Sequence, residues 1–294
     1  MTTIRPARPD EFGKVVALAR QTLAMPAISE ALIARDFLLA PGYRAEHLLV
    51  AEASGTLAGF ALVPRADALG PPHSGWIAAF GVDPGYRRRG IGTQLLGRAI
   101  DDMRRDSVTR IDVADVPVRY LLPGVDRAAF PGAYALLEKL GFTVREEVAS
   151  MGIALDRDFP DAAEVRPATP GELPLVREFF AEGWDNGWWG HFERSALLKL
   201  LGDPTPSEIL GWWEDDRVLG LSHYRGNRFG PLAVGPKARG RGLGVALTQA
   251  TLAAMRRAGL ADAYFLVGRE DVQPFYARLG FSVLRRFTKL ALQL

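Results

Sequence analysis

Hydrophobic and polar residues alternate over two pairs of short segments, one pair in each half of the chain. Segments 47–53 and 57–63 are separated by Ser-Gly, and segments 209–214 and 218–224 by Asp-Asp. Short apolar-rich runs divided by turn residues are typical of β-hairpins. The pattern therefore predicts one antiparallel hairpin in each half.

Apolar residues at helical spacing precede each hairpin, after an opening that contains proline, a residue that suits the first helical turn. They are Val15, Val16, Leu18 and Ala19 in the first half, and Leu175, Val176, Phe179 and Phe180 in the second. After the hairpins, apolar runs at 76–82 and 232–234 enter glycine-rich segments, and residues 95–103 resume the helical spacing. This order predicts a strand, a glycine loop and a helix.

Each half continues with a further strand, at 110–114 or 263–267, and a short helix that ends at the Gly-Phe pair 141–142 or 280–281. We expect a hairpin to close each half. Strands and helices in this order predict an α/β protein with a mixed sheet and helices on both faces.

Three segments of the first half recur, in the same order, in the second half. The matched segments are 4–11 with 165–172, 82–92 with 234–244, and 136–142 with 275–281. Three matches in the same order are hard to produce by chance. Because there are only two copies and each is long, each copy must form its own hydrophobic core. The sequence predicts two tandem domains, residues 1–157 and 164–294, joined by the polar, proline-bearing segment 156–163.

Composition narrows the possible functions. The 294 residues carry 36 Lys and Arg against 34 Asp and Glu, a net charge of +2, so we expect neither a nucleic-acid partner nor an anionic membrane. The chain has no cysteine, which excludes disulfides and a cysteine nucleophile. Its four histidines show no metal-ligand spacing. No apolar stretch is long enough to span a bilayer and no leader pattern is present, so we expect a cytoplasmic protein.

The pattern Arg-x-x-Gly-x-Gly stands at the strand-to-helix junction of both copies, from Arg87 to Gly92 and from Arg239 to Gly244. Glycine lets the backbone approach an anion closely, and the unpaired amides of a helix N-terminus bind phosphate. The arginines can add charge-assisted contacts. The expected ligand is a phosphorylated cofactor.

Three other interpretations of these loops are weaker. A P-loop requires Gly-Lys followed by Ser or Thr, which is absent. A dinucleotide fingerprint requires a third glycine, although Asp112 and Asp262 stand where its ribose-binding acid would be. The glycines could also serve only as tight turns, but the full duplication of the spacing speaks against it.

The loops, the lead-in Val-x-Pro-x-x-Arg, the opening Ile-Arg-Pro-Ala and the late Phe-Tyr-x-x-Leu-Gly-Phe together resemble the GNAT family of N-acetyltransferases. The resemblance covers both halves and implies two tandem GNAT domains that use acetyl-CoA. In that family the loop amides hold the pyrophosphate and the preceding strand pairs with the pantetheine arm. The resemblance places the cofactor-binding positions at Leu232, Val234, Arg239, Gly240, Arg241, Gly242, Leu243, Gly244, Val245 and Ala246 in the second copy, and at Phe80, Val82, Arg87, Arg88, Arg89, Gly90, Ile91, Gly92 and Thr93 in the first.

The resemblance also implies the chemistry. In the family an amine attacks the thioester directly, and a tyrosine protonates the leaving sulfur. Tyr276 occupies that tyrosine's position in the second copy, whereas the first copy has Leu137, with Tyr134 nearby on the same helix as a substitute. The amide of Val234 is expected to polarise the carbonyl. Tyr276 could alternatively be an aromatic that only packs its helix against the sheet.

The remaining candidates are less specific. The base could be Glu208, Glu214, His223 or a chain of water. The aromatic segment 184–192 of the second copy could shape the acceptor pocket or pack against the first domain. The first copy carries an insertion around 118–127 that could cover a ligand cleft or contact the other domain.

The sequence thus predicts an acetyl-CoA-dependent N-acetyltransferase that acetylates a small-molecule or peptide amine, with an active second domain and a degenerate first one. Two alternatives stay open: a noncatalytic acyl-CoA-binding or scaffolding protein, and a protein whose first domain is the active one. We expect a monomer, since two fused copies can form internally the contact that single-domain relatives form by dimerising.

Overall fold

A computed structural model of the chain describes residues 2–23, 34, 38–39, 43–66, 71–116, 121–181, 187–215 and 217–294, without the side chains of 187, 188 and 191. The chain forms two compact units. The N-terminal unit comprises Met1–Val148 and Arg286–Leu294, and the C-terminal unit comprises Ala149–Arg285.

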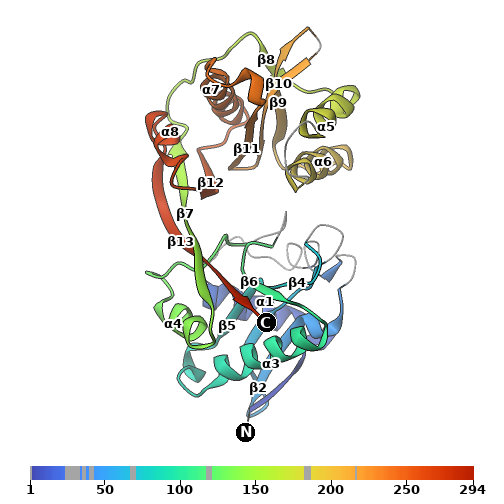
Figure 1. The fold of residues 1–294 in the computed structure, drawn as a ribbon, viewed down its shortest axis with the longest axis vertical. Coiled ribbons are helices and arrows are strands. Elements are labelled where there is room, and N and C mark those ends of the chain that lie inside the picture. Colours follow the sequence, from blue (N-terminus) through green and yellow to red (C-terminus); the bar gives the residue numbers. More distant parts are fainter. Residues whose placement is uncertain are drawn as a thin grey trace. The chain divides into compact units, whose positions relative to one another are not determined.

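The N-terminal unit follows the predicted order of elements (Figure 1). Its elements are β1 (Thr2–Pro6), α1 (Phe12–Leu23), β2 (Leu48–Ala53), β3 (Thr56–Leu62), β4 (Ser74–Ile77), β5 (Ala79–Val82), α3 (Ile91–Arg105), β6 (Arg110–Val113), α4 (Pro131–Lys139) and the first half of β7 (Thr143–Ala154), with single 3-10 turns at Pro9–Glu11, Ala45–His47 and Pro84–Tyr86. Strands β1-β2-β3-β5 form an antiparallel sheet, and β4 pairs with β6 in parallel.

Alternation along β2 explains why helices cover both faces of this sheet. Leu48 and Val50 pack in the core that α1 covers, and Leu49 and Ala51 pack in the core that α3 covers. Strand β2 is therefore buried on both sides. The prediction of a mixed sheet with helices on both faces is confirmed.

The C-terminal unit repeats this arrangement. Its elements are β8 (Val165–Pro167), α5 (Leu173–Ala181), α6 (Gly187–Leu200), β9 (Ser207–Glu214), β10 (Arg217–Arg225), β11 (Arg228–Val234), α7 (Leu243–Arg257), β12 (Asp262–Gly268), α8 (Gln273–Arg278) and the first part of β13 (Ser282–Gln293), with 3-10 turns at Pro170–Glu172 and Pro236–Ala238. The sheet order is β8-β9-β10-β11-β12-β7. Helices α5 and α6 contribute to one core, and α7 contributes to another.

The ends of both halves differ from the prediction. The expected closing hairpin is wrong, because β7 and β13 are each one continuous strand of 12 residues. Residues 149–154 of β7 pair with β12 in the C-terminal unit, and residues 291–293 of β13 pair with β6 in the N-terminal unit. Each unit thus receives a strand from the other half of the sequence, and the units differ from the predicted ranges 1–157 and 164–294 by this exchange.

Candidate active site

The two glycine loops have the same backbone shape. Gly90 and Gly242, the residues before α3 and α7, have φ angles of 78° and 85°. Side chains with a Cβ adopt this left-handed conformation only with strain, which explains glycine at both positions. Each helix begins at the next residue, so the amides of its first two residues have no acceptor within the helix, and amides of this kind bind anions.

Both loops also carry the same arginine contact. Arg87 donates from Nε to the carbonyl oxygen of Val82 at 3.1 Å, and Arg239 donates from Nε to that of Val234 at 3.3 Å. These bonds tie the loop to the end of the preceding strand. They also direct part of each guanidinium toward the protein backbone and not toward a ligand.

The loops differ at one backbone position. Arg88 has a φ of 61°, where the C-terminal loop has Gly240 with a φ of 79°. A side chain in this region is uncommon and strained. The N-terminal loop therefore has the same backbone geometry as the C-terminal loop, but with an arginine at a position where glycine adopts the left-handed conformation more readily.

The sheet opens next to each loop. In the N-terminal unit the extended stretch 74–82 changes partner at Ala78: β4 pairs with β6, whereas β5 pairs with β3. In the C-terminal unit β11 meets β12 only at Arg228 and Tyr264. Beyond these points the neighbouring strands diverge.

Backbone amides face both openings. Gly235 donates to the carbonyl of Leu219, and Asp83 donates to that of Ala58. Because hydrogen-bonded and unbonded positions alternate along an antiparallel pair, the amides of Val234 and Val82 turn away from the hairpin and toward the opening. The same alternation applies two residues earlier, at Leu232 and Phe80. These four residues include the strand positions expected to pair with pantetheine.

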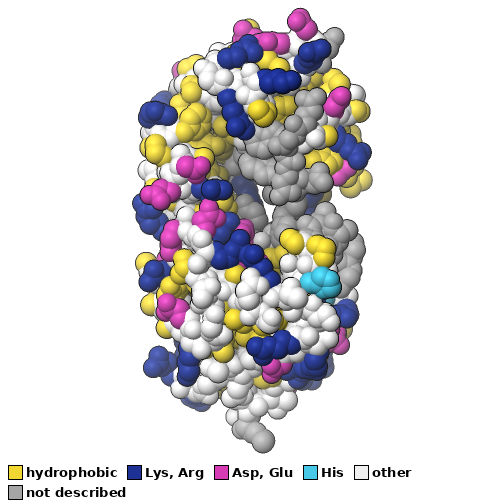
Figure 2. All heavy atoms as spheres, viewed as in Figure 1, with side chains coloured by type: hydrophobic (Ala, Val, Ile, Leu, Met, Phe, Trp, Pro, Cys, Tyr) yellow, Lys and Arg dark blue, Asp and Glu magenta, His cyan; other side chains and the backbone are white. Residues whose placement is uncertain are grey.

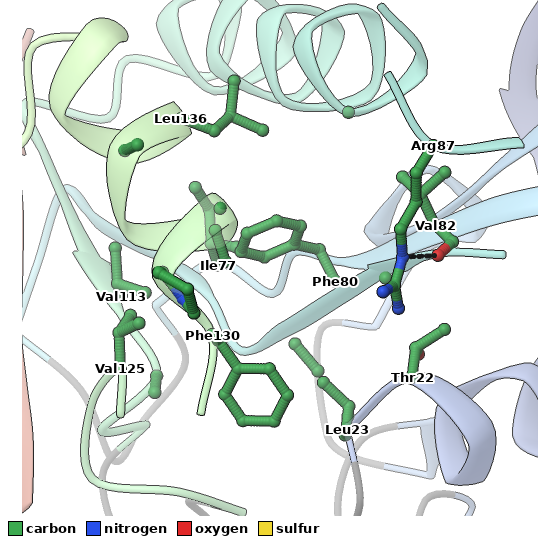
Figure 3. Close-up of a pocket in the computed structure, with 18 of the residues that line it drawn as sticks. Thr22, Leu23, Ile77, Phe80, Val82, Arg87, Val113, Val125, Phe130 and Leu136 are labelled. Carbon is green, nitrogen blue, oxygen red and sulfur yellow. Dashed lines mark hydrogen bonds between the residues drawn. The ribbon is translucent and has the colours of Figure 1, made fainter. Parts of the chain in front are cut away.

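The opening of the N-terminal unit is a cavity of about 720 Å³ (Figure 3). Its walls come from β5, the glycine loop, helix α4 and the stretch between β6 and α4. Of the first-copy positions predicted from the resemblance, those that line it are Phe80, Val82, Arg87, Arg88, Gly90, Ile91, Gly92 and Thr93. Arg89 is not among the lining residues; it lies over the ring of Tyr86 at 5.3 Å and donates to the carbonyl of Gly85.

Tyr276 lies on α8 within an aromatic cluster of the C-terminal unit. Its ring centroid is 4.4 Å from that of Phe265 and 6.0 Å from that of Phe229. The adjacent Phe275 lies 3.5 Å from where a Cβ on Gly244 would stand, which places α8 against the start of α7. Burial raises the pKa of Tyr276 above its usual value, so its hydroxyl is protonated at neutral pH.

In the described part of the N-terminal unit, the helix equivalent to α8 brings no tyrosine to the cavity. Leu137 is fully buried in the core, and Tyr134 is buried beneath the guanidinium of Arg127, which lies 4.2 Å from its ring centroid. Neither Leu137 nor Tyr134 is among the residues that line the cavity.

The structure separates the candidate bases. Glu214 accepts a hydrogen bond from Arg241 at 2.5 Å, and this contact lowers the pKa of Glu214. His223 is buried, with Nε2 2.7 Å from the hydroxyl of Ser195 and Nδ1 3.2 Å from the carbonyl oxygen of Gly230 on β11. His223 is therefore the candidate that lies against the diverging strand.

Some predicted features fall outside the described residues. Trp184 lies there, as does the side chain of Trp188, so the role of the segment 184–192 stays a prediction. Within the described ranges, no group of three or more His, Cys, Asp or Glu residues could hold a metal ion. Figure 2 shows basic and acidic side chains interspersed over the visible face, in keeping with the net charge of +2.

The sequence does not indicate the aromatic packing around Tyr276 or the residues that enclose the N-terminal cavity. Nothing in the spacing of Phe229 and Phe265 distinguishes them from other core positions. The insertion does carry a signal, and its role in covering a ligand cleft or in contacting the other domain stays a prediction. Its described residues Leu121, Leu122, Gly124 and Val125 line the cavity.

Comparison with known proteins agrees with this geometry. The Acetyltransferase (GNAT) family matches residues 23–142 and 173–281. A mycothiol acetyltransferase of Actinosynnema mirum is 30% identical over 94% of this chain and 93% of its own length, and one of Salinispora arenicola is 31% identical over 82% and 80%. A solved tandem GNAT protein from the clavulanic acid biosynthesis pathway has a TM-score of 0.73 and 20% identity, covering 100% of this chain and 98% of its own.

The chain belongs to the GNAT family of acetyltransferases, with two GNAT regions in tandem. It is an acetyl-CoA-dependent N-acetyltransferase, as the resemblance of its sequence implied. In the part of the chain that the structure describes, no helix has the length and apolar character needed to cross a membrane.

Proposed function

We propose that the C-terminal unit transfers the acetyl group of acetyl-CoA to the amine of a small molecule related to mycothiol. One observation carries the choice of unit: Tyr276 stands on α8 beside the start of α7, whereas the N-terminal unit has the buried Leu137 at that position. The names of the relatives that match nearly the whole chain support the choice of acceptor.

The C-terminal loop and strand fit acetyl-CoA. The amides of Leu243 and Gly244 at the start of α7 would receive the pyrophosphate, since those of Val245 and Ala246 donate to the carbonyl oxygen of Gly242. The backbone of Leu232 and Val234 would pair with the pantetheine arm. Gly240 and Gly242 keep the loop free of side chains on its ligand face. Arg239 and Arg241 flank the loop, although Arg241 also pairs with Glu214.

Bound acetyl-CoA supplies the activated thioester. The amide of Val234 donates to the thioester oxygen and stabilises the negative charge that develops on it. The nitrogen lone pair of the acceptor forms the new C–N bond as the C–S bond breaks, and the amine's extra proton passes to water or to a base. Tyr276 gives its hydroxyl proton to the departing sulfur and regains one from solvent.

The test is release of CoA thiol by the full chain, with acetyl-CoA and a panel that holds a mycothiol-related amine, unrelated small amines and a peptide N-terminus. We expect turnover with the mycothiol-related amine well above that with the peptide. A preference for the peptide would contradict the proposed acceptor. Acetyl-CoA binding without turnover across the panel would favour the noncatalytic alternative.

A further inference from the structure

The cavity of the N-terminal unit is bordered by a segment that has no counterpart of similar length in the C-terminal unit. Residues 114–130 connect β6 to α4, whereas only residues 269–272 connect β12 to α8. From the described part of this longer connection Leu121, Leu122, Gly124, Val125, Ala129 and Phe130 line the cavity. These residues form one wall of the cavity, and we call the space beside them the chamber.

This chamber wall is fixed in place. Val125 and Thr288 exchange two backbone hydrogen bonds of 2.9 Å, and a Cβ on Gly124 would stand only 2.5 Å from the carbonyl oxygen of Thr288. The carboxylate of Asp126 accepts from the amides of two following residues at 3.0 Å each. Thr288 lies in the second half of β13, so the exchanged strand braces the wall.

The chamber is lined mainly by apolar side chains, with the hydroxyl-bearing Thr22 beside Leu23 (Figure 3). Leu23 of α1, Ile77 of β4 and Val113 of β6 face it together with Val125 and Phe130. Figure 3 shows Leu23, Val125 and Phe130 gathered at the end away from Leu136, the residue that contacts the glycine loop at Gly92. A ligand held at the loop would direct its far end into this apolar space.

Among its described lining residues, the chamber shows no group for acyl transfer. Among the described residues that line the cavity, the side chains that titrate are Tyr86, Arg87, Arg88 and Lys139. The first three belong to the loop segment, and Lys139 is the last residue of α4, at the opposite end from Phe130. No side chain of this set stands at the apolar end to accept a proton from an amine or to protonate a thiolate.

From this combination we propose that the N-terminal unit binds an acyl-CoA whose acyl chain is longer than acetyl, and holds it without transferring it. The inference rests on the proposed function in one respect: the C-terminal loop is proposed to hold CoA, and the N-terminal loop, which has the same backbone shape, would hold it in the same way. The remaining support is independent of it: a mostly apolar chamber, a braced wall and the absence of an acid among the described lining residues.

The affinity of the N-terminal unit should rise with chain length. Each methylene buried in an apolar site tightens binding about fourfold. Butyryl-CoA, which has two methylenes more than acetyl-CoA, should therefore bind about fifteenfold more tightly. Hexanoyl-CoA should bind at least as tightly as butyryl-CoA.

The experiment is calorimetric titration of the full chain carrying Gly242→Val, which distorts the C-terminal loop so that remaining binding reports the N-terminal unit. CoA, acetyl-CoA, butyryl-CoA, hexanoyl-CoA and free hexanoate are the probes. We expect one site with affinity in that order for the CoA compounds, and no binding of hexanoate. Addition of Gly90→Val should remove the site.

Two variants change the volume of the chamber in opposite directions. Ala133→Leu, at a lining position of α4, should weaken hexanoyl-CoA binding by about tenfold and leave CoA binding unchanged. Phe130→Ala should shift the preference toward longer chains. Ala128→Leu, at an exposed residue of the same connection that does not line the cavity, is the matched control and should change neither.

The outcomes separate this inference from the proposed function. If CoA and acetyl-CoA bind but the longer chains bind no more tightly, the acyl chamber is wrong while the loop assignment stands. If none of the CoA compounds binds, both are wrong for this unit. Equal binding of free hexanoate would mean that the chamber takes carboxylic acids and would overturn the proposal, as would release of CoA thiol from butyryl-CoA by this variant.

Discussion

The ring of Tyr276 packs against the ring of Phe265 at an interplanar angle of 48°, with their centroids 4.4 Å apart. Phe265 belongs to β12, the strand that diverges from β11, and Tyr276 belongs to α8, which contacts the start of α7. This packing therefore fixes the phenol with respect to both the opening and the glycine loop. Apolar rings around it also raise the pKa of Tyr276, which keeps the proton on the hydroxyl.

The first prediction concerns the effect of removing the Tyr276 hydroxyl. Tyr276→Phe retains the ring and its packing, so the melting temperature should change little. The leaving thiolate would lose its proton donor, and we expect kcat to fall about 10²-fold or more with KM for acetyl-CoA nearly unchanged. Steady-state assays of thiol release measure both constants.

The matched control is Tyr134→Phe, on the equivalent helix of the N-terminal unit, which should leave kcat unaltered. An unchanged kcat in Tyr276→Phe would show that another group, or water, protonates the sulfur.

A duplicated ion pair gives the second prediction. Arg5 binds Glu11 through two hydrogen bonds of 2.7 and 2.8 Å, and Arg166 binds Glu172 in the same way at 2.7 and 3.0 Å. These contacts lower the pKa of Glu11 and of Glu172 to about 2. The Glu11 side chain is only 4% exposed, whereas that of Glu172 is 22% exposed.

Because water screens Glu172 more, Glu11→Gln should destabilise the fold by about 3 kcal/mol and Glu172→Gln by about 1 kcal/mol. Both carboxylates have a lower pKa in the folded chain, so their contribution is present above pH 4.5 and is lost as the pH falls toward 2. Urea unfolding at pH 7 and pH 3 measures the difference. Equal destabilisation by the two variants would contradict the burial argument.

His47 gives the third prediction. It is 3% exposed, and burial, with the charges of Arg65 and Arg44, lowers the pKa of His47 to about 4. The unfolded chain takes up this proton near pH 6.5, so the folded state loses stability as the pH falls from 6.5 to 4, by up to about 3 kcal/mol.

His47→Gln removes this titration. Its unfolding free energy should fall less than that of the parent protein between pH 7 and pH 4.5, measured by urea unfolding at each pH. Parallel pH curves for the two proteins would show that His47 is not buried in its neutral form.

The order of elements and both loops could be predicted from the sequence because their signals are local. Gly90 and Gly242 mark left-handed helix starts, and alternation along 48–51 marks a strand buried on both faces. The left-handed backbone at Arg88 could not be predicted from the sequence, because arginine rarely adopts this conformation.

The exchange of β7 and β13 could not be predicted in this way. A twelve-residue strand after each Gly-Phe pair carries no local mark of which sheet it joins, because either sheet offers an edge of the same kind. The packing of Phe265 on Tyr276 likewise depends on contacts distant in sequence. Periodicity identifies such residues as buried but does not identify their partners.

The central claim is that acetyl transfer takes place in the C-terminal unit, and the matched variants Gly90→Val and Gly242→Val test it most directly. Both residues precede a helix with φ near 80°, and a Cβ added at either would have no protein atom closer than 3.7 Å, so valine strains both loops alike. The measurement is thiol release from acetyl-CoA with a mycothiol-related amine. Gly242→Val should lower kcat/KM about 10²-fold or more while Gly90→Val stays within about twofold of the parent protein. Loss of turnover through Gly90→Val alone would place the chemistry in the N-terminal unit and contradict this account.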